Sequence, residues 1–273
     1  MITNSFDGAC SAITKSICQL FTLKPGTKYV VRPVGSSVLL GHNEIFYCVT
    51  NAHILDHINF NKIFAMIGNG NNCSIGGELR STAPPDKGDR KDDIYDITIV
   101  KLDEQTVTTL KSAGYVFLHI DDIHSAYQAG PFNKLLFLGY PISKTKFDYP
   151  GNKIILSPIK FLGNPITKEY RSLPFNLATH IMVKYERKNL MDENSNFITG
   201  PVPRGLSGSG IWEIGYSGDK CIVQLVGILT EYNDNRSILI GTKIGLVIGA
   251  IKGLFDPSIP GGLQMTITEL DND

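Results

Sequence analysis

Two serines and three glycines stand close together in the run Pro203-Arg204-Gly205-Leu206-Ser207-Gly208-Ser209-Gly210-Ile211-Trp212, which ends on the only tryptophan of the chain. Glycine adopts tight backbone conformations without steric cost, so the run predicts a sharp turn that exposes the Ser207 hydroxyl. Such a turn also leaves successive backbone N–H groups pointing to one side, as the binding of a developing oxyanion requires. Plain turns and linkers are also rich in glycine and serine, so the rest of the chain must decide between the two interpretations.

Two upstream segments supply the partners that a nucleophilic serine needs. Residues 45–53 form a strand pattern that ends on small residues and His53, and Asp96 precedes a β-branched strand over 97–102. The order along the chain is therefore His, Asp, Ser. An α/β-hydrolase places its histidine after the serine, and no histidine of this chain follows His180, so that scaffold is excluded for Ser207.

Other assignments of the base and the acid compete with this one. A subtilisin-type order could formally use Asp96, His119 and Ser207. However, His119 lies in an alternating apolar run, which favours a packed strand residue. Asp92 and Asp93 are alternatives for the acid, but only Asp96 stands directly before the apolar strand.

Taken together, these segments resemble the chymotrypsin-fold (trypsin-like) serine proteases, in the style of HtrA-type and other bacterial trypsin-like peptidases. The resemblance rests on residues 35–40, 50–53, 96–102 and 205–210, with weaker support from 138–141 and 226–230. It implies an all-β fold of two six-stranded antiparallel β-barrels, with the active site in the cleft between them and a C-terminal helix. Many short apolar runs separated by turn clusters agree with such barrels.

The resemblance divides the chain into five parts. We expect an N-terminal lead-in over 1–24, a first barrel with His53 and Asp96 over 25–120, a linker over 121–133, a second barrel with Ser207 over 134–245, and a helix and tail over 246–273. A length of 273 residues is enough for one such two-lobed unit.

The implied function is that of a serine endopeptidase, a hydrolase that cleaves peptide bonds through an acyl-enzyme. His53 would take the proton of Ser207, and Asp96 would hold the imidazole and stabilise its charged form. The backbone N–H groups of Gly205 and Ser207 would form the oxyanion hole. The alternative is a catalytically silent binding or regulatory module of the same fold, since an intact triad does not guarantee an ordered oxyanion loop.

Leu206 stands where the digestive enzymes of the family carry an aspartate that pairs with a newly cleaved N-terminus. Activation by that ion pair is therefore not available, and the oxyanion loop is either formed from the outset or ordered by substrate or an activating partner protein. Pro201 occupies the position at the base of the specificity pocket, while Thr230, Glu231 and Tyr232 would edge the substrate strand. Because no carboxylate stands at the position of Pro201, we expect an uncharged, small or apolar preference.

Composition limits the partners. Lys and Arg together number 26, as do Asp and Glu, so nothing indicates nucleic acid or an anionic membrane. No signal peptide or membrane segment is evident, and the apolar run 244–251 is too short to span a bilayer. Five cysteines without a pairing pattern favour a reducing compartment, so we expect a cytoplasmic protein that acts on a protein or peptide. His53 and His57 have helical metal-site spacing but lack a third ligand, so we expect no metal and no cofactor.

Overall fold

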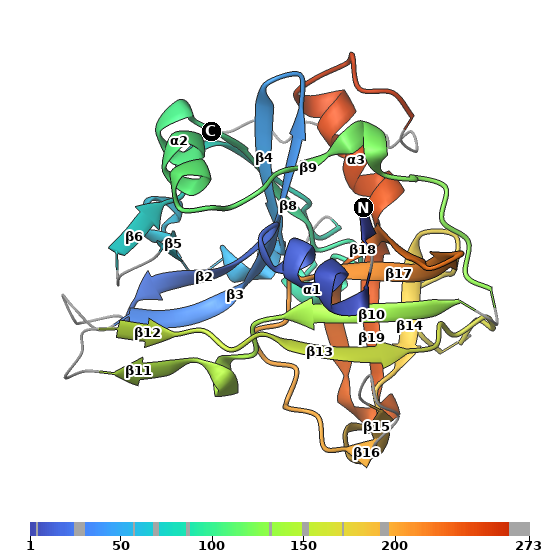
Figure 1. The fold of residues 1–273 in the computed structure, drawn as a ribbon. Coiled ribbons are helices and arrows are strands. Elements are labelled where there is room, and N and C mark those ends of the chain that lie inside the picture. Colours follow the sequence, from blue (N-terminus) through green and yellow to red (C-terminus); the bar gives the residue numbers. More distant parts are fainter. Residues whose placement is uncertain are drawn as a thin grey trace.

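Two curled antiparallel sheets make up most of the molecule (Figure 1). The computed structural model describes residues 1–3, 5–24, 31–56, 58–67, 71–85, 88–130, 133–148, 153–170, 172–191 and 197–261. The two sheets confirm the expected all-β fold class, and the C-terminal helix is present as α3 (Ile244–Leu254). Residues 262–273 of the expected tail, like His57, lie outside the described residues.

The first sheet has the strand order β6-β5-β2-β3-β4-β8-β7, and β9 pairs in parallel with β3. Its strands are β2 (Ile17–Leu23), β3 (Val31–His42), β4 (Ile45–Thr50), β5 (Phe64–Ile67), β6 (Asn71–Ser74), β7 (Gly77–Ser81), β8 (Thr98–Leu102) and β9 (Leu118–His119). The described residues thus form eight strands here, where six were expected. One of them is the two-residue β9, too short to leave a periodic pattern in the sequence.

The second sheet follows the order β13-β10-β17-β18-β19-β14, and β1 pairs with β18 beside this path. Its strands are β1 (Ile2–Thr3), β10 (Lys134–Gly139), β13 (Ile159–Gly163), β14 (His180–Lys184), β17 (Gly210–Ser217), β18 (Lys220–Asn233) and β19 (Ile238–Lys243). Two small hairpins lie outside both sheets: β11 (Lys146–Asp148) with β12 (Lys153–Ile155), and β15 (Leu190–Met191) with β16 (Phe197–Ile198). A register shift in the β18–β19 pairing between Leu229 and Glu231 marks a bulge at Thr230, which redirects the strand there.

The N-terminal segment crosses from one sheet to the other. Helix α1 (Phe6–Thr14) starts after Ser5, whose hydroxyl accepts a hydrogen bond from Gly8 N, and it contacts both β10 and β2. The first sheet then starts with β2, ahead of the boundary expected at residue 25. Helix α2 (Glu104–Ser112) is capped by Asp103 and connects β8 to β9.

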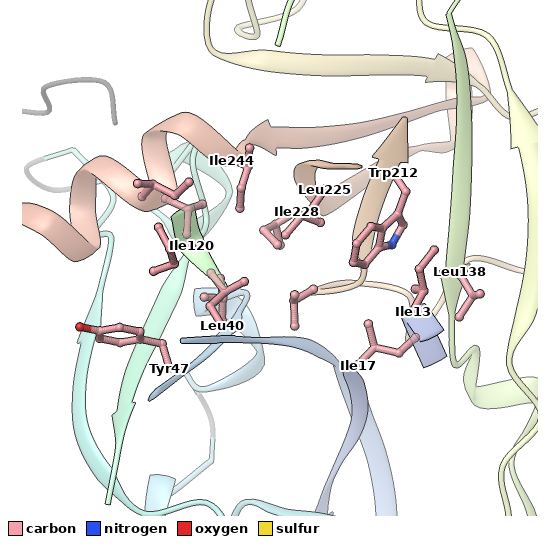
Figure 2. Close-up of a cluster of buried hydrophobic side chains, with 14 of the residues drawn as sticks. Ile13, Ile17, Leu40, Tyr47, Ile120, Leu138, Trp212, Leu225, Ile228 and Ile244 are labelled. Carbon is pink, nitrogen blue, oxygen red and sulfur yellow. The ribbon is translucent and has the colours of Figure 1, made fainter. Parts of the chain in front are cut away.

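The largest apolar core lies between the two sheets. Figure 2 shows Leu40 and Tyr47 of the first sheet in one cluster with Leu225, Ile228 and Trp212 of the second. The helices add side chains to the same cluster, among them Ile13 from α1 and Ile244 from α3. Each curled sheet also has an apolar cluster of its own. Apolar packing therefore joins the two sheets and fixes the residues that meet across their interface.

Two further expectations concern the surroundings of the protein. No helix among the described residues is long and apolar enough to cross a membrane. None of the five cysteines, all of which are described, forms a disulfide, and all five are buried.

Candidate active site

His53 and Asp96 form a directly bonded pair. His53 lies in the 3-10 turn Ala52–Ile54 just after β4, and its Nδ1 is 2.6 Å from Asp96 Oδ2. The backbone N–H of His53 donates to the other carboxylate oxygen at 2.8 Å. The His53 side chain is 41% exposed, whereas that of Asp96 is 13% exposed. The carboxylate thus fixes the orientation of the ring and leaves Nε2 for another partner.

Asp96 has an unusual backbone conformation, with a φ of 47° in the left-handed region. A non-glycine residue stays there only when its surroundings impose it. The Asp96 N–H donates to Asp93 Oδ1 at 3.1 Å, and the Asn51 amide donates to Asp96 O at 2.8 Å. From the second sheet, the Thr242 hydroxyl donates to Tyr95 O at 2.8 Å. These bonds hold the Asp96 carboxylate toward His53.

His180, the first residue of β14, also reaches the loop that carries Asp96. Its Nε2 lies 2.9 Å from Ile94 O, and its ring stacks on Tyr95 with centroids 5.8 Å apart. Burial lowers the pKa of His180, which favours the neutral ring as a donor to the Ile94 carbonyl. The second sheet therefore helps to position the acid of the first.

Arg90 links the segments on which His53 and Asp96 lie. Its Nε and Nη2 donate to the Asp56 carboxylate, both at 2.7 Å, and its Nη1 donates to Asp93 at 2.7 Å. The Asp93 side chain is 1% exposed, so the guanidinium lies beside a carboxylate that water hardly reaches. Asp93 therefore stabilises the loop that carries Asp96.

Asp92, the other alternative for the acid, also has a structural role. Asp92 accepts the backbone N–H of Asp89 at 2.8 Å and so caps the short turn Arg90–Asp92. Asp96, and neither Asp92 nor Asp93, is bonded to His53. His119, the histidine of the subtilisin-type alternative, pairs with Asp121 instead and is 54% exposed, where a packed strand residue was expected.

Ser207 lies on two successive tight turns. Leu206 N–H donates to Pro203 O, and Ser209 N–H donates to Leu206 O, each at 2.9 Å. The third residue of each turn is a glycine with positive φ, 93° at Gly205 and 85° at Gly208. Turns of type II need this conformation at that position, which explains the glycine spacing around the serine.

Ser36 of β3 ties this loop to the first sheet. Its N–H donates to Ser207 O at 2.8 Å, and its hydroxyl donates to Gly205 O at 2.9 Å. A Cβ added to Gly208 would lie 1.9 Å from Ser36 O, so only glycine permits this approach. A Cβ added to Gly35 would meet both Ile54 Cδ1, at 2.2 Å, and Ser207 O, at 3.2 Å. In space, Gly35 alone thus stands between the Ser207 backbone and Ile54, a residue of the turn that carries His53.

The Gly205 N–H is turned away from the neighbouring Ile142 segment. Arg204 O accepts a hydrogen bond from Ile142 N at 2.9 Å. Because no peptide bond of the described chain is cis, the Gly205 N–H points away from Ile142. Within the described part of the chain, neither this N–H nor that of Ser207 has an acceptor. Leu206 is 2% exposed and packs in the core of the second sheet, so apolar burial holds this loop in place.

The residues expected around the substrate make hydrogen bonds and ring contacts within the protein itself. The Tyr185 hydroxyl donates to Pro201 O at 2.8 Å, and its ring packs edge-on against Tyr232 at 5.7 Å. Thr230 is 4% exposed, and its hydroxyl donates to Ile240 O at 3.1 Å. Partial burial and the nearby Asp96 raise the pKa of Glu231, while His53 lowers it. Glu231 is therefore a further carboxylate close to the His53 and Asp96 pair.

The comparisons with known proteins identify the fold. No protein-family model matches the chain, and none of the curated proteins is significantly similar to it in sequence. Mouse neuropsin, a serine protease, superposes with a TM-score of 0.54 at 13% identity, covering 90% of this chain and 96% of its own. An inactivated protease paralogue of the scabies mite superposes with a TM-score of 0.53 at 13% identity and the same coverage. The chain has the chymotrypsin (trypsin-like) fold.

Proposed function

We propose that this chain is a serine endopeptidase with His53, Asp96 and Ser207 as its catalytic triad. The observation that carries the proposal is the His53 and Asp96 pair, in which a nearly buried carboxylate binds Nδ1 of a half-exposed imidazole. That arrangement selects the tautomer whose Nε2 is free to accept a proton. Ser207 is supported as the nucleophile by Ser36, whose N–H donates to Ser207 O, and by Gly35, where an added Cβ would meet both Ser207 O and Ile54.

The reaction follows from these positions. Ser207 Oγ attacks the peptide carbonyl carbon while its proton moves to His53 Nε2, and the oxyanion binds the N–H groups of Gly205 and Ser207. The proton then passes from His53 to the leaving amine as the C–N bond breaks, which leaves an ester on Ser207. Water, deprotonated by His53, hydrolyses this ester and restores the serine.

The oxyanion loop supports activity without a cleavage step. Two tight turns, the Ser36 bonds and the burial of Leu206 hold Gly205 in an orientation that points its N–H away from Ile142. The role of the aspartate and N-terminus pair of the digestive enzymes is thus taken by apolar packing. We retain the proposal that substrates present small or apolar side chains at Pro201, and that the protein works in a reducing, cytoplasmic environment, in which its five buried thiols would persist.

A fluorophosphonate probe tests the proposal directly, because it reacts only with an activated serine. We expect the wild-type chain to be labelled and Ser207→Ala not to be. Ser209→Ala is the matched control, because Ser209 belongs to the same loop but its side chain is buried. This control should label as the wild type does.

A second candidate function is a silent binding module of the same fold. It is favoured by one observation: in the described part of the chain, Ser207 Oγ makes no hydrogen bond to His53, whose ring is bonded only to Asp96. Such contacts often tighten only when substrate binds. If the folded wild type takes up no more probe than Ser207→Ala, the enzyme proposal is wrong and the binding module remains.

A further inference from the structure

A second group of histidine and aspartate side chains lies away from the proposed triad. His42 ends β3, His119 ends β9, and Asp121 follows in the turn Ile120–Asp122. The parallel pairing of β9 with β3 sets Gly41 opposite His119, which brings the two histidines to the same edge. One ligand atom from each of His42, His119 and Asp121 lies within 4.8 Å of the other two. This cluster and His53 lie at opposite ends of β4, a strand of roughly 20 Å.

The His42 ring is buried with an unused nitrogen. Its side chain is 5% exposed, and Nδ1 has no hydrogen-bond partner although Asp121 Oδ1 lies only 3.2 Å away. The nitrogen therefore lies beside the carboxylate without pointing at it. A buried polar atom without a partner is unfavourable, so a ligand that accepts the Nδ1 lone pair would relieve a real cost.

The ligand atoms lie close to the separations found around a small metal ion. His42 Nδ1 lies 3.2 Å from Asp121 Oδ1, and His119 Nδ1 lies 3.3 Å from the other oxygen, Asp121 Oδ2. In a tetrahedral site with bonds of about 2.0 Å, neighbouring ligand atoms are about 3.3 Å apart. One ligand atom of each residue lies within 4.8 Å of the other two, so a small turn of the exposed Asp121 or His119 side chain would bring all three to this separation.

The far side of the His42 ring is held by a second layer of polar groups. Nε2 lies 2.9 Å from the Asn43 amide, 3.4 Å from Ser258 Oγ and 4.0 Å from Asp256 Oδ2. Ser258 in turn donates its hydroxyl to Asp256 at 2.6 Å. Metal-binding histidines are oriented in this way through their other nitrogen, which carries the proton. In the structure the Asn43 amide nitrogen faces Nε2, so a metal on Nδ1 requires this amide to be turned over, with its oxygen accepting the Nε2 proton.

We propose that His42, His119 and Asp121 bind a divalent transition metal such as Zn²⁺. Two imidazoles and one carboxylate suit Zn²⁺ better than Ca²⁺ or Mg²⁺, which prefer oxygen ligands. The exposed side chains of His119 and Asp121 leave the fourth position open to water. The ion links the β3–β4 turn to the segment that leads from the first sheet to the second. Its role is structural, and it does not depend on the proposed peptidase activity.

Zinc binding by the purified full chain tests this proposal. After EDTA treatment and dialysis, we expect one equivalent of Zn²⁺ per chain in a calorimetric titration. Saturating Zn²⁺ should raise the melting temperature by about 5 °C, since a ligand of the folded state stabilises it in proportion to the logarithm of its concentration. Mg²⁺ at the same concentration should not.

Two variants identify the site. His119→Ala and Asp121→Asn each change a partly exposed ligand, so they should keep the metal-free melting temperature but lose at least tenfold in zinc affinity and lose the zinc-dependent rise. The matched control is His124→Ala, an exposed histidine on the same segment, which should behave as the wild type. If the wild type binds no zinc at micromolar concentrations, or if His119→Ala binds it equally well, the proposal is wrong. Binding at His53 would give the second outcome.

Discussion

Two histidine and aspartate pairs flank β4, and they are built in opposite ways. At one end, an exposed His53 is bonded to a nearly buried Asp96, with the ring nitrogen 2.6 Å from the carboxylate. At the other end, a buried His42 lies 3.2 Å from an Asp121 that is 41% exposed, and its nearest nitrogen has no hydrogen bond.

The difference separates two kinds of chemistry. A general base must present one nitrogen to substrate while a shielded carboxylate controls the other. A metal ligand must instead keep its lone pair toward a site that several side chains share, so it should not donate to the neighbouring carboxylate. Under the two proposals, the same two residue types would serve proton transfer at one end and metal binding at the other, according to which partner is buried and how the ring is turned.

The largest expected effect is on the first pair. Asp96→Asn should lower the rate of fluorophosphonate labelling of Ser207 by about 10⁴-fold, because an amide supports the wrong tautomer of the ring. Asp122→Asn, an exposed carboxylate beside the second pair, should leave the rate unchanged. Labelling rates at pH 7.5 measure both. A rate within tenfold of wild type for Asp96→Asn would remove this residue from the triad.

The next effect concerns the cation that holds the first pair in place. Arg90→Gln removes the cation that pairs with the buried Asp93 carboxylate, which should cost about 3 kcal/mol in the free energy of unfolding. Arg80→Gln is the matched control, since Arg80 pairs with Glu78 at the surface, where both side chains are almost half exposed. That change should cost about 0.5 kcal/mol or less. Urea unfolding at pH 7 compares them, and equal losses would contradict the assignment of Arg90.

A third prediction concerns pH. Burial lowers the pKa of His180, so the folded state holds this ring neutral at a pH where the unfolded chain binds a proton. Stability should therefore fall as the pH drops below about 6.5, by at most about 1.4 kcal/mol per pH unit for one proton. In His180→Gln this part of the pH dependence should be absent. Urea unfolding at pH 7.5 and 5.5 tests it, with the exposed His124→Gln as a control, and an unchanged pH dependence in His180→Gln would count against it.

The smallest effect is expected at Glu231. Partial burial and Asp96 raise the pKa of this carboxyl, so its ionisation above that pKa opposes folding. Glu231→Gln should raise the melting temperature at pH 8 by about 1 °C, a small value because the side chain is largely exposed and screened. At pH 4, where the wild-type carboxyl is largely protonated, the gain should disappear. Thermal melts at the two pH values decide this.

The fold and the pairing of His53 with Asp96 could be predicted because their signals are local. His53 and Asp96 each adjoin a strand pattern, and the glycines around Ser207 mark the two turns that the structure contains. Ser36 could not be found in this way, since its partners lie about 170 residues further along the chain.

Other determinants were hidden for the same physical reason. Arg90 lies in a polar loop that reads as solvent-exposed, and only the fold shows that it bonds to Asp56 and Asp93. The apolar neighbours of His119 predict a packed strand residue, whereas its side chain is 54% exposed. Its place beside His42 follows from the parallel register of a two-residue strand, which no periodic pattern could reveal.

The pairing of β1 with β18 bears on how the molecule unfolds. Ile2 and Thr3, which form the first strand of the chain, pair with Ile222 and Cys221 of the second sheet. The next strand, β2, starts only fourteen residues after Thr3 and belongs to the first sheet. The second lobe is thus not a contiguous stretch of polypeptide, because the whole first sheet lies between β1 and β10. A cut between the lobes would leave the second lobe without β1, so the molecule should melt in a single cooperative transition, and the second half should regain its full structure only when it is mixed with the first.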